Sequence, residues 1–296
     1  MLRLGNEALD WKQRLTELSM PPLSVTFTEA VRLMNQPELM EARRVAETIR
    51  RDPVVTVRIL RIVNSAYYGL RAKVGTIEHA VVLLGAEAAV GFVVGMGIVA
   101  MRRHFHLELR RTAMEVIRHL IATGAIASQI AQLLGWGRKG IEFTAGLLHD
   151  VGKLALLYNT SSLYQEICEK PADAIPEAEE AHFGLHHAEL GALLAEQWAF
   201  PAELVEAIRW HHSPAEASPE HRATAWIVHL ADAAAYAFRL GGHQDGLARR
   251  NAFYDPASWE AFAEAVGRGL DVAEVIAHLE NGQIQLHRFV EMLLRE

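Results

Sequence analysis

Residues 147–153 read Leu147-Leu148-His149-Asp150-Val151-Gly152-Lys153 (LLHDVGK), which places an imidazole next to a carboxylate inside an apolar run. The preceding residues, FTAGLL (143–148), continue the apolar pattern, so the pair is predicted to lie inside a buried helix over about residues 140–158. A charge in such a place is costly unless a hydrogen-bonding partner or a cation stabilises it. The stretch therefore indicates either a metal site or a buried ion pair.

Helical periodicity dominates the rest of the chain, and no run of alternating apolar and polar residues is long enough to predict a strand. We therefore expect an all-α fold. Ser24 or Thr26 can cap a first helix that runs to Met34, and Asp52-Pro53 is typical of the cap and first turn of another that ends at Gly69. Further helices are predicted at about residues 41–50, 110–134, 140–158, 161–169, 186–198, 201–212, 222–239, 256–265 and 271–295.

Charge and histidine content divide the chain near residue 115. The 296 residues are 51% hydrophobic and 22% charged, as in an ordinary globular protein. Residues 1–115 carry a net charge of +4 and residues 116–296 one of −11, while twelve of the fifteen histidines lie at or beyond His119. Acids and imidazoles are the usual ligands of transition metals, so the second part is the one expected to bind metal.

Two features bear on the location of the protein. Its single cysteine, Cys168, excludes an internal disulfide and a thiolate zinc cluster, and the N-terminal residues lack the apolar core of a secretory signal. A cytoplasmic location is expected. The segment Ala80–Met101 is long enough to span a bilayer and has one formal charge, Glu87, but four glycines interrupt it. We expect buried core helices there and no membrane span.

Seven potential ligands fall at inward positions of successive predicted helices. They are His119, His149, Asp150, His187, His211, His212 and Asp232. For each residue alone, a hydrogen-bonded core histidine or a capped acid is the simpler interpretation. Taken together, the residues indicate a metal site in the core of a helical bundle. Imidazoles with carboxylates suit iron, manganese or zinc, and a carboxylate such as Asp150 can bridge two ions, so one or two divalent ions are predicted.

LLHDVGK, with His119 upstream and Asp232 downstream, resembles the H…HD…D signature of the HD metal-dependent phosphohydrolase superfamily. The flanking stretches MPPLSVTFTEAVRLMNQP (20–37) and NSAYYGL (64–70) resemble the HDOD family, the HD-related output domain of bacterial signalling proteins. The resemblance covers about residues 15–240. It implies a multi-helix HD-like bundle over residues 116–296, preceded by an extra N-terminal helical subdomain over residues 1–115.

The resemblance also assigns roles to the candidate ligands. First-metal ligands would be His119, His149, Asp150 and Asp232, and second-metal ligands would be His187 and His211 or His212. Lys153 matches the lysine that is placed to contact phosphate in active HD relatives. HDOD domains have commonly lost much of this signature and act in signalling without a shown catalytic activity, whereas this chain keeps it. After His211-His212 comes Ser-Pro-Ala-Glu and not the Gly-Tyr-Pro motif of the sister HD-GYP family, which argues against cyclic dinucleotide hydrolysis.

Three functions follow, in order of preference. In the first, the protein is a regulatory output module that binds signalling proteins or a small phosphorylated ligand, and its metal site is structural or sensory. In the second, it is a metal-dependent phosphohydrolase with Asp150 and Lys153 as catalytic residues. In the third, it is a metal-free scaffold. A charge of +4 over the first 115 residues is too weak to favour nucleic acid as a partner.

Overall fold

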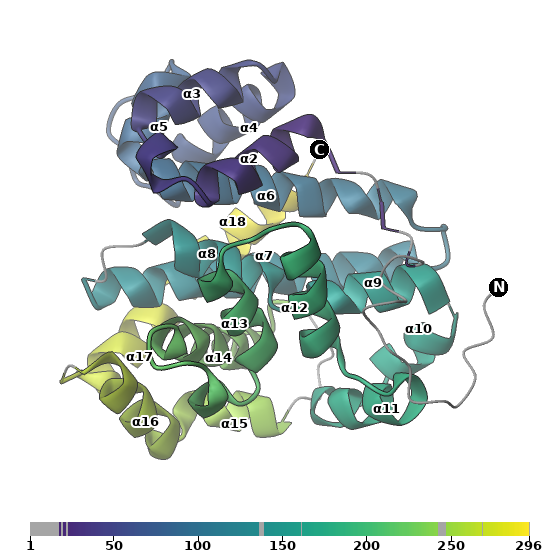
Figure 1. Cartoon of the computed structure of the whole chain (residues 1–296). Helices are drawn as coiled ribbons and strands as arrows, with labels where there is room; N and C mark the ends of the chain where they lie inside the picture. Colours follow the sequence, from purple (N-terminus) through teal and green to yellow (C-terminus); the bar gives the residue numbers. More distant parts are fainter. Residues whose placement is uncertain are drawn as a thin grey trace.

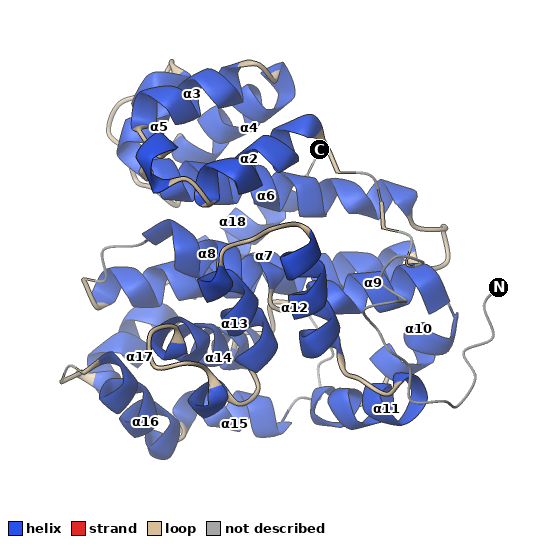
Figure 2. Ribbon diagram, viewed as in Figure 1, coloured by secondary structure: helices blue, strands red, loops and turns tan. Residues whose placement is uncertain are grey.

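The computed structural model describes residues 18, 20–21, 23–135, 139–160, 162–241, 247–267 and 269–295. Every regular element within these ranges is a helix (Figure 2), which confirms the all-α prediction. The α-helices are α2 (Val25–Met34), α3 (Ala42–Arg50), α4 (Pro53–Val63), α5 (Ile77–Leu84), α6 (Ala86–Met101), α7 (Arg110–Leu133), α8 (Lys139–Leu148), α9 (Val151–Thr160), α10 (Ser162–Cys168), α11 (Ile175–Phe183), α12 (His187–Gln197), α13 (Ala202–Trp210), α14 (Arg222–Ala237), α15 (Leu247–Tyr254), α16 (Pro256–Val266), α17 (Val272–Asn281) and α18 (Gln283–Leu294). Short 3₁₀ helices lie at Pro37–Leu39, Arg102–His104, Ala172–Ala174 and Pro214–Glu216.

Side-chain caps start two of the N-terminal helices where the sequence predicted them. The Oγ of Ser24 accepts a hydrogen bond from the backbone N–H of Phe27 at 3.1 Å and begins α2. The carboxylate of Asp52 accepts two backbone N–H groups at the start of α4, where Pro53 occupies the first turn. Each cap supplies acceptors for N–H groups that have no partner inside the helix.

Helix α4 ends earlier than predicted. Its last residue is Val63, and Gly69 lies beyond it in a turn with a φ of 58°. The amide of Asn64 closes the helix, because its Nδ2 donates to the carbonyl of Leu60 at 2.7 Å and to that of Val74 at 2.9 Å. Its Oδ1 also accepts the N–H of Val74 at 2.8 Å. A side chain that bonds the backbone of a later loop in this way favours a stop over another helical turn.

The prediction of a single helix over residues 140–158 is wrong, because two helices lie there. Helix α8 ends at Leu148, α9 begins at Val151, and the His149-Asp150 pair forms the turn between them. The Nδ1 of His149 donates to the carbonyl of Gly146 at 2.7 Å, which competes with helix continuation at this point. The helix predicted over residues 271–295 is likewise divided, into α17 and α18, and α11 and α15 were not predicted.

The apolar segment Ala80–Met101 forms parts of two helices, α5 and α6, which meet at Gly85. Within the described ranges, no single helix has the length and apolar composition required to cross a bilayer. The two helical stretches Ile77–Leu84 and Ala86–His104 meet that requirement only as a pair, and they are bent by 107° relative to each other. Helix α6 packs against α2 and α8 and is buried over most of its length.

The helices stack so that α7 and α8 form a middle layer (Figure 1). On one side lie α6, with the N-terminal helices above it, and α18 from the other end of the chain. On the opposite side lie α12, α13 and α14. Helices α7 and α8 approach closely at two glycines, since a Cβ on Gly146 would lie 2.8 Å from the Cα of Gly124. The division of the chain near residue 115 stays a prediction.

Candidate metal centre

The structure brings every predicted ligand into one cluster beneath the middle layer. Helices α7, α9, α12 and α14, the turn between α8 and α9, and the residues that follow α13 all contribute to it. All members except the half-buried His212 are buried. The members are His119, His149, Asp150, Lys153, His187, His211, His212 and Asp232.

One half of the cluster is the quartet His119, His149, Asp150 and Asp232. Single ligand atoms of the first three all lie within 4.8 Å of one another, close enough to share a metal ion. The Oδ1 of Asp232 lies 2.7 Å from Nε2 of His119 and 3.6 Å from Nε2 of His149. The Nε2 of His149 is also 3.4 Å from Oδ2 of Asp150. These are the four residues that the HD resemblance assigns to a first metal.

The other half consists of His187, His211 and His212, whose ligand atoms also lie within 4.8 Å of one another. The Nε2 atoms of His187 and His212 are 2.9 Å apart. The Oδ1 of Asp150 lies 2.9 Å from Nε2 of His187 and 3.6 Å from Nε2 of His211. Asp150 therefore turns Oδ2 toward the first half and Oδ1 toward the second, as a bridging carboxylate must.

Backbone carbonyls orient two of the imidazoles. The Nδ1 atoms of His149 and His211 lie 2.7 Å from the carbonyl oxygens of Gly146 and Ile208, so each Nδ1 is assigned as the donor. Each Nε2 then faces the cluster, and that of His211 has no hydrogen-bond partner among the described residues. Buried polar atoms rarely stay unsatisfied. A divalent cation in the second half of the cluster fits this donor, because it would give the Nε2 of His211 a partner.

The charges of the cluster partly balance one another in the metal-free protein. Burial raises the pKa of Asp150, but Lys153, His149 and His187 outweigh burial and hold that pKa well below its usual range. Burial lowers the pKa of His149, but the carboxylates of Asp150 and Asp232 outweigh it and raise the pKa to about 9. A metal ion at this site must therefore displace a proton from His149.

Burial and the neighbouring His149 have the opposite effect on His211, whose pKa falls well below the usual range. The imidazole of His211 is therefore neutral at physiological pH. A neutral imidazole is the form that binds a metal, so this residue is ready to act as a ligand.

Glu179 on α11 is a member of the site that the sequence analysis missed. Its Oε2 lies 2.6 Å from Nδ1 of His187 and accepts the backbone N–H of the same residue at 2.7 Å, while Oε1 accepts the hydroxyl of Tyr164. Burial raises the pKa of Glu179, but His187 outweighs it, so the pKa is lowered and the acid is ionised. The acid thereby keeps the proton of His187 on Nδ1 and orients the ring so that Nε2 faces Asp150. No motif or spacing in the sequence marks this glutamate.

Gly152, within the LLHDVGK stretch, also has a role that the sequence analysis did not assign. A Cβ at this position would lie 2.0 Å from the carbonyl oxygen of His187 and 2.9 Å from the backbone nitrogen of Gly191. Helix α9 can therefore contact α12 this closely only because residue 152 has no side chain. The contact places the first residue of α12, His187, against Asp150.

The cluster is least buried at His212, which is half-buried and whose ring centroid lies 6.1 Å from that of the half-buried His186. Lys153 does not line this side, because it is only 4% exposed and its Nζ donates to Oδ2 of Asp150 at 2.6 Å. The phosphate contact that the resemblance implies for Lys153 stays a prediction.

Comparisons with known proteins agree with this architecture. The sequence profile of the HDOD domain matches residues 20–214. An uncharacterized protein of Treponema pallidum (strain Nichols) is 25% identical over 210 residues, which are 68% of this chain and 39% of that protein. The chain thus spans well under half the length of this curated relative.

Solved structures share the fold. A crystal structure of an HDOD domain protein with unknown function from Geobacter sulfurreducens has a TM-score of 0.78 at 24% identity, with 95% of this chain and 96% of that one covered. A "Putative phosphohydrolase" from Shewanella amazonensis SB2B has a TM-score of 0.69 at 24% identity, with 95% and 97% covered. A "Putative signal transduction protein" from Marinobacter aquaeolei VT8 has a TM-score of 0.71 at 20% identity, with 96% and 62% covered.

The family profile extends from just before the first N-terminal helix, α2, to Pro214, shortly after His212, and so it includes both halves of the cluster except Asp232. With the all-α fold and the H…HD pattern in place, the chain belongs to the HDOD domain family.

Proposed function

We propose that this protein is a cytoplasmic regulatory output module of bacterial signalling, which acts by binding a protein partner or a small ligand. One or two divalent ions in its HD-like core, of iron, manganese or zinc, would serve a structural or sensory role. The observation that carries the proposal is a full set of ligands enclosed in the core. Asp150 and His187, at the centre of that set, are 1% and 0% exposed. An ion enclosed in this way can stabilise the fold or act as part of a sensor more readily than it can catalyse the reaction of a bulky substrate.

The donors for a first ion would be His119, His149, Asp150 and Asp232, and those for a second would be Asp150, His187, His211 and His212. A divalent ion held by such ligands supplies a Lewis acid and lowers the pKa of bound water. The chain itself orients the ligands through two backbone carbonyls and Glu179, and it excludes bulk water by burial.

A metal-dependent phosphohydrolase is the second candidate, and the position of Asp150 between two histidine groups favours it. The half-buried His212 marks the side from which a phosphoester would have to enter. In this function Asp150 and Lys153 would be the catalytic residues. A metal-free scaffold is the third candidate, and it is favoured by the Lys153 ammonium, which neutralises Asp150 without any ion.

Metal analysis of protein purified without an affinity tag separates these functions. The proposal expects about one or two equivalents of iron, manganese or zinc. It also expects no hydrolysis of p-nitrophenyl phosphate, bis(p-nitrophenyl) phosphate or nucleotides that depends on Asp150, as judged against Asp150→Ala. Hydrolysis lost in that variant would establish the phosphohydrolase instead. Protein that neither retains nor takes up metal would establish the scaffold.

A further inference from the structure

A cavity of about 180 Å³ lies between the turn that follows α4 and helix α18. The turn contributes Ala66 and Tyr67, which belong to the NSAYYGL stretch (64–70). Helix α18 contributes Arg288, Phe289 and Met292 from one of its faces. None of these five residues belongs to the candidate metal centre, so the cavity is a separate feature of the chain.

Hydrogen bonds and ring stacking hold the walls of this cavity in place. The Oγ of Ser65 donates to a carbonyl of the last turn of α4 at 2.7 Å. The ring of Tyr67 stacks on that of Phe289, with centroids 4.2 Å apart and planes 25° apart. The hydroxyl of Tyr67 accepts a hydrogen bond from Nε2 of Gln129 on α7 at 3.0 Å. Walls that are formed before a ligand arrives lower the entropic cost of binding it.

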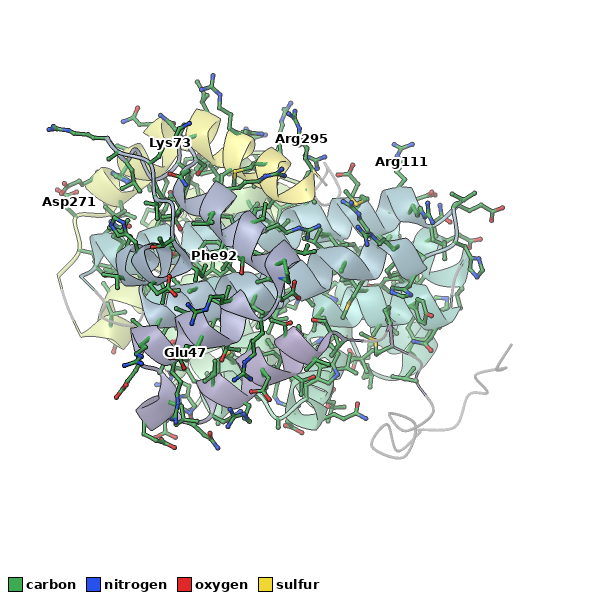
Figure 3. The ribbon with its side chains drawn as sticks, turned by 90° about the horizontal axis from the view of Figure 1, so that it is seen from above. Glu47, Lys73, Phe92, Arg111, Asp271 and Arg295 are labelled. Carbon is green, nitrogen blue, oxygen red and sulfur yellow. The ribbon has the colours of Figure 1, made fainter. Side chains whose placement is uncertain are left out.

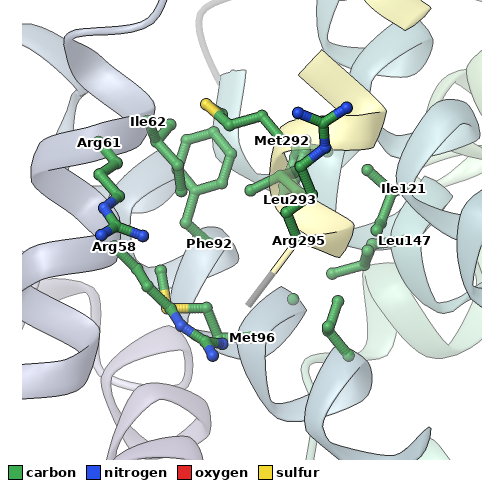
Figure 4. Close-up of a pocket in the computed structure, with 13 residues that line it drawn as sticks. Arg58, Arg61, Ile62, Phe92, Met96, Ile121, Leu147, Met292, Leu293 and Arg295 are labelled. Carbon is green, nitrogen blue, oxygen red and sulfur yellow. The ribbon is translucent and has the colours of Figure 1, made fainter. Parts of the chain in front are cut away.

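The volume of the cavity suits one aromatic ring. An apolar cavity of roughly 150 Å³ is large enough to bind benzene, and this one has about 180 Å³. Phe289 and Met292 offer a ring and a thioether, and both groups make favourable contacts with aromatic ligands. A neighbouring cavity, which shares Met292 and is also lined by Phe92 and Met96 (Figure 4), has only about 40 Å³ and is too small for a ring.

Arg288 gives the larger cavity a positive edge. Its side chain is exposed and forms no ion pair or hydrogen bond with any residue in the described ranges. Among the described residues that line the cavity, none is acidic. Burial raises the pKa of Tyr67 to about 12, so this wall is neutral at physiological pH. A single guanidinium can bind one carboxylate or phosphoryl group through two parallel hydrogen bonds, so this edge favours an anion.

We propose that the cavity binds a single-ring aromatic anion, with its ring against Phe289 and Met292 and its carboxylate or phosphoryl group at Arg288. Such a ligand would contact the NSAYYGL turn and α18 together. Through Tyr67 and Gln129 its site is hydrogen-bonded to α7, the helix that carries His119. The ligand would be the small-molecule signal of the regulatory module, and this biological role rests on the proposed function.

Fluorine NMR titration of the full chain with 4-fluorobenzoate tests the proposal. We expect saturable binding of one equivalent. Arg288→Gln should weaken binding by at least about tenfold, because it removes the charged hydrogen bonds. Ala66→Phe, at an exposed position, should abolish binding by filling the cavity.

Arg111→Gln is the matched control for the loss of an exposed arginine. Arg111 lies about 27 Å along α7 from Gln129, and it is well separated from Arg295 beyond the end of α18 (Figure 3). This variant should bind 4-fluorobenzoate as the wild type does. An equal loss of binding in Arg111→Gln and Arg288→Gln would overturn the proposal, because the effect would then not be local to the cavity.

Comparison ligands test each part of the proposed chemistry. Equal affinity for 4-fluorobenzyl alcohol would overturn the proposal, because Arg288 would then select nothing. Competition by cyclohexanecarboxylate as strong as that by benzoate would overturn the assignment of an aromatic ligand. Stronger competition by phenylphosphonate than by benzoate would support a phosphorylated ligand, and the reverse order would support a carboxylic acid.

Chelator treatment separates this cavity from the metal centre. Helix α18 lies on the opposite side of the middle layer from α12, α13 and α14 (Figure 1), so removal of metal should leave the affinity for 4-fluorobenzoate unchanged. Binding that is lost with the metal would overturn the proposal, because the carboxylate would then lie on the ion. Protein that never holds metal but binds 4-fluorobenzoate would refute the metal centre alone. Protein that holds metal but does not bind 4-fluorobenzoate would refute this cavity alone.

Discussion

The Glu179 carboxylate supports the His187 imidazole from behind, with Oε2 of the acid 2.6 Å from Nδ1 of the ring. The other ring nitrogen, Nε2, lies 2.9 Å from Oδ1 of Asp150. The ring thus lies between two carboxylates, one outside the candidate metal centre and one at its middle. Because Glu179 comes from α11 and Asp150 from the turn after α8, this chain of contacts connects two separate parts of the bundle.

Replacing Glu179 should weaken metal binding although Glu179 is not itself a ligand. Glu179→Gln keeps the size of the side chain but removes the charge that holds the His187 tautomer, and loss of such a partner lowers metal affinity by about 10- to 100-fold. Competition with a chromophoric zinc chelator measures the change. Glu177→Gln, an exposed glutamate on the same helix, is the matched control and should bind zinc as the wild type does. Equal affinities for both variants would show that Glu179 plays no part.

Adding one methyl group at Gly152 should destabilise the fold. In Gly152→Ala the Cβ would lie 2.0 Å from the carbonyl oxygen of His187, and two helix backbones must move to relieve the contact. Overpacking of this kind costs about 1–3 kcal/mol. Urea unfolding checks the change against Gly75→Ala, where a Cβ meets nothing within 4 Å. Two variants of equal stability would mean that α9 and α12 are not held together at this contact.

Removal of metal should lower the melting temperature. An ion that binds only the folded chain adds about 2.7 kcal/mol when it is present at about 100 times its dissociation constant. His149→Ala should lose most of this increment, because it removes a ligand at the centre of the site. His79→Ala, an exposed histidine on α5, should keep it. Differential scanning calorimetry with and without a chelator gives the result, and an unchanged melting temperature for the wild type would contradict a folded-state metal site.

Metal binding should also depend on pH through His149. With its pKa raised to about 9, this histidine carries a proton in the metal-free protein at neutral pH. The raised pKa stabilises the metal-free fold fully below its unfolded value of about 6.5, and that stabilisation is lost as the pH rises through about 9.

Each ion that reaches this imidazole must release the proton, so affinity should rise by up to about tenfold per pH unit between pH 7 and 9 from this group alone. Calorimetric titration with zinc at pH 7.5, in buffers of different ionisation enthalpy, counts the protons released. The count should fall in His149→Ala. Release of no proton by the wild type would contradict the protonated state.

Much of this architecture follows from local sequence. The caps at Ser24 and Asp52 predict where α2 and α4 begin, because a side-chain acceptor acts on N–H groups only two or three residues away. Helical periodicity predicts that His119 and Asp232 face inward, since each shares a face with apolar neighbours. The H…HD…D pattern thus indicated both the HD-like bundle and the residues that gather in its core.

Apolar periodicity could not predict the rest. The helix breaks at His149-Asp150, where the Nδ1 of His149 donates to the carbonyl of Gly146, although the apolar pattern continues through this point. Glu179 joins the site only because α11 docks beside α12, and nothing in its own neighbourhood distinguishes it from the exposed Glu180 that follows. The sequence by itself determined most of the helices, though not α11, α15 or the division of two predicted helices, and it determined which histidines and aspartates point inward, because these features depend on near neighbours. Only the tertiary structure decided how the two oxygens of Asp150 are shared, what supports His187 and how deeply the centre is buried, because these depend on helix packing.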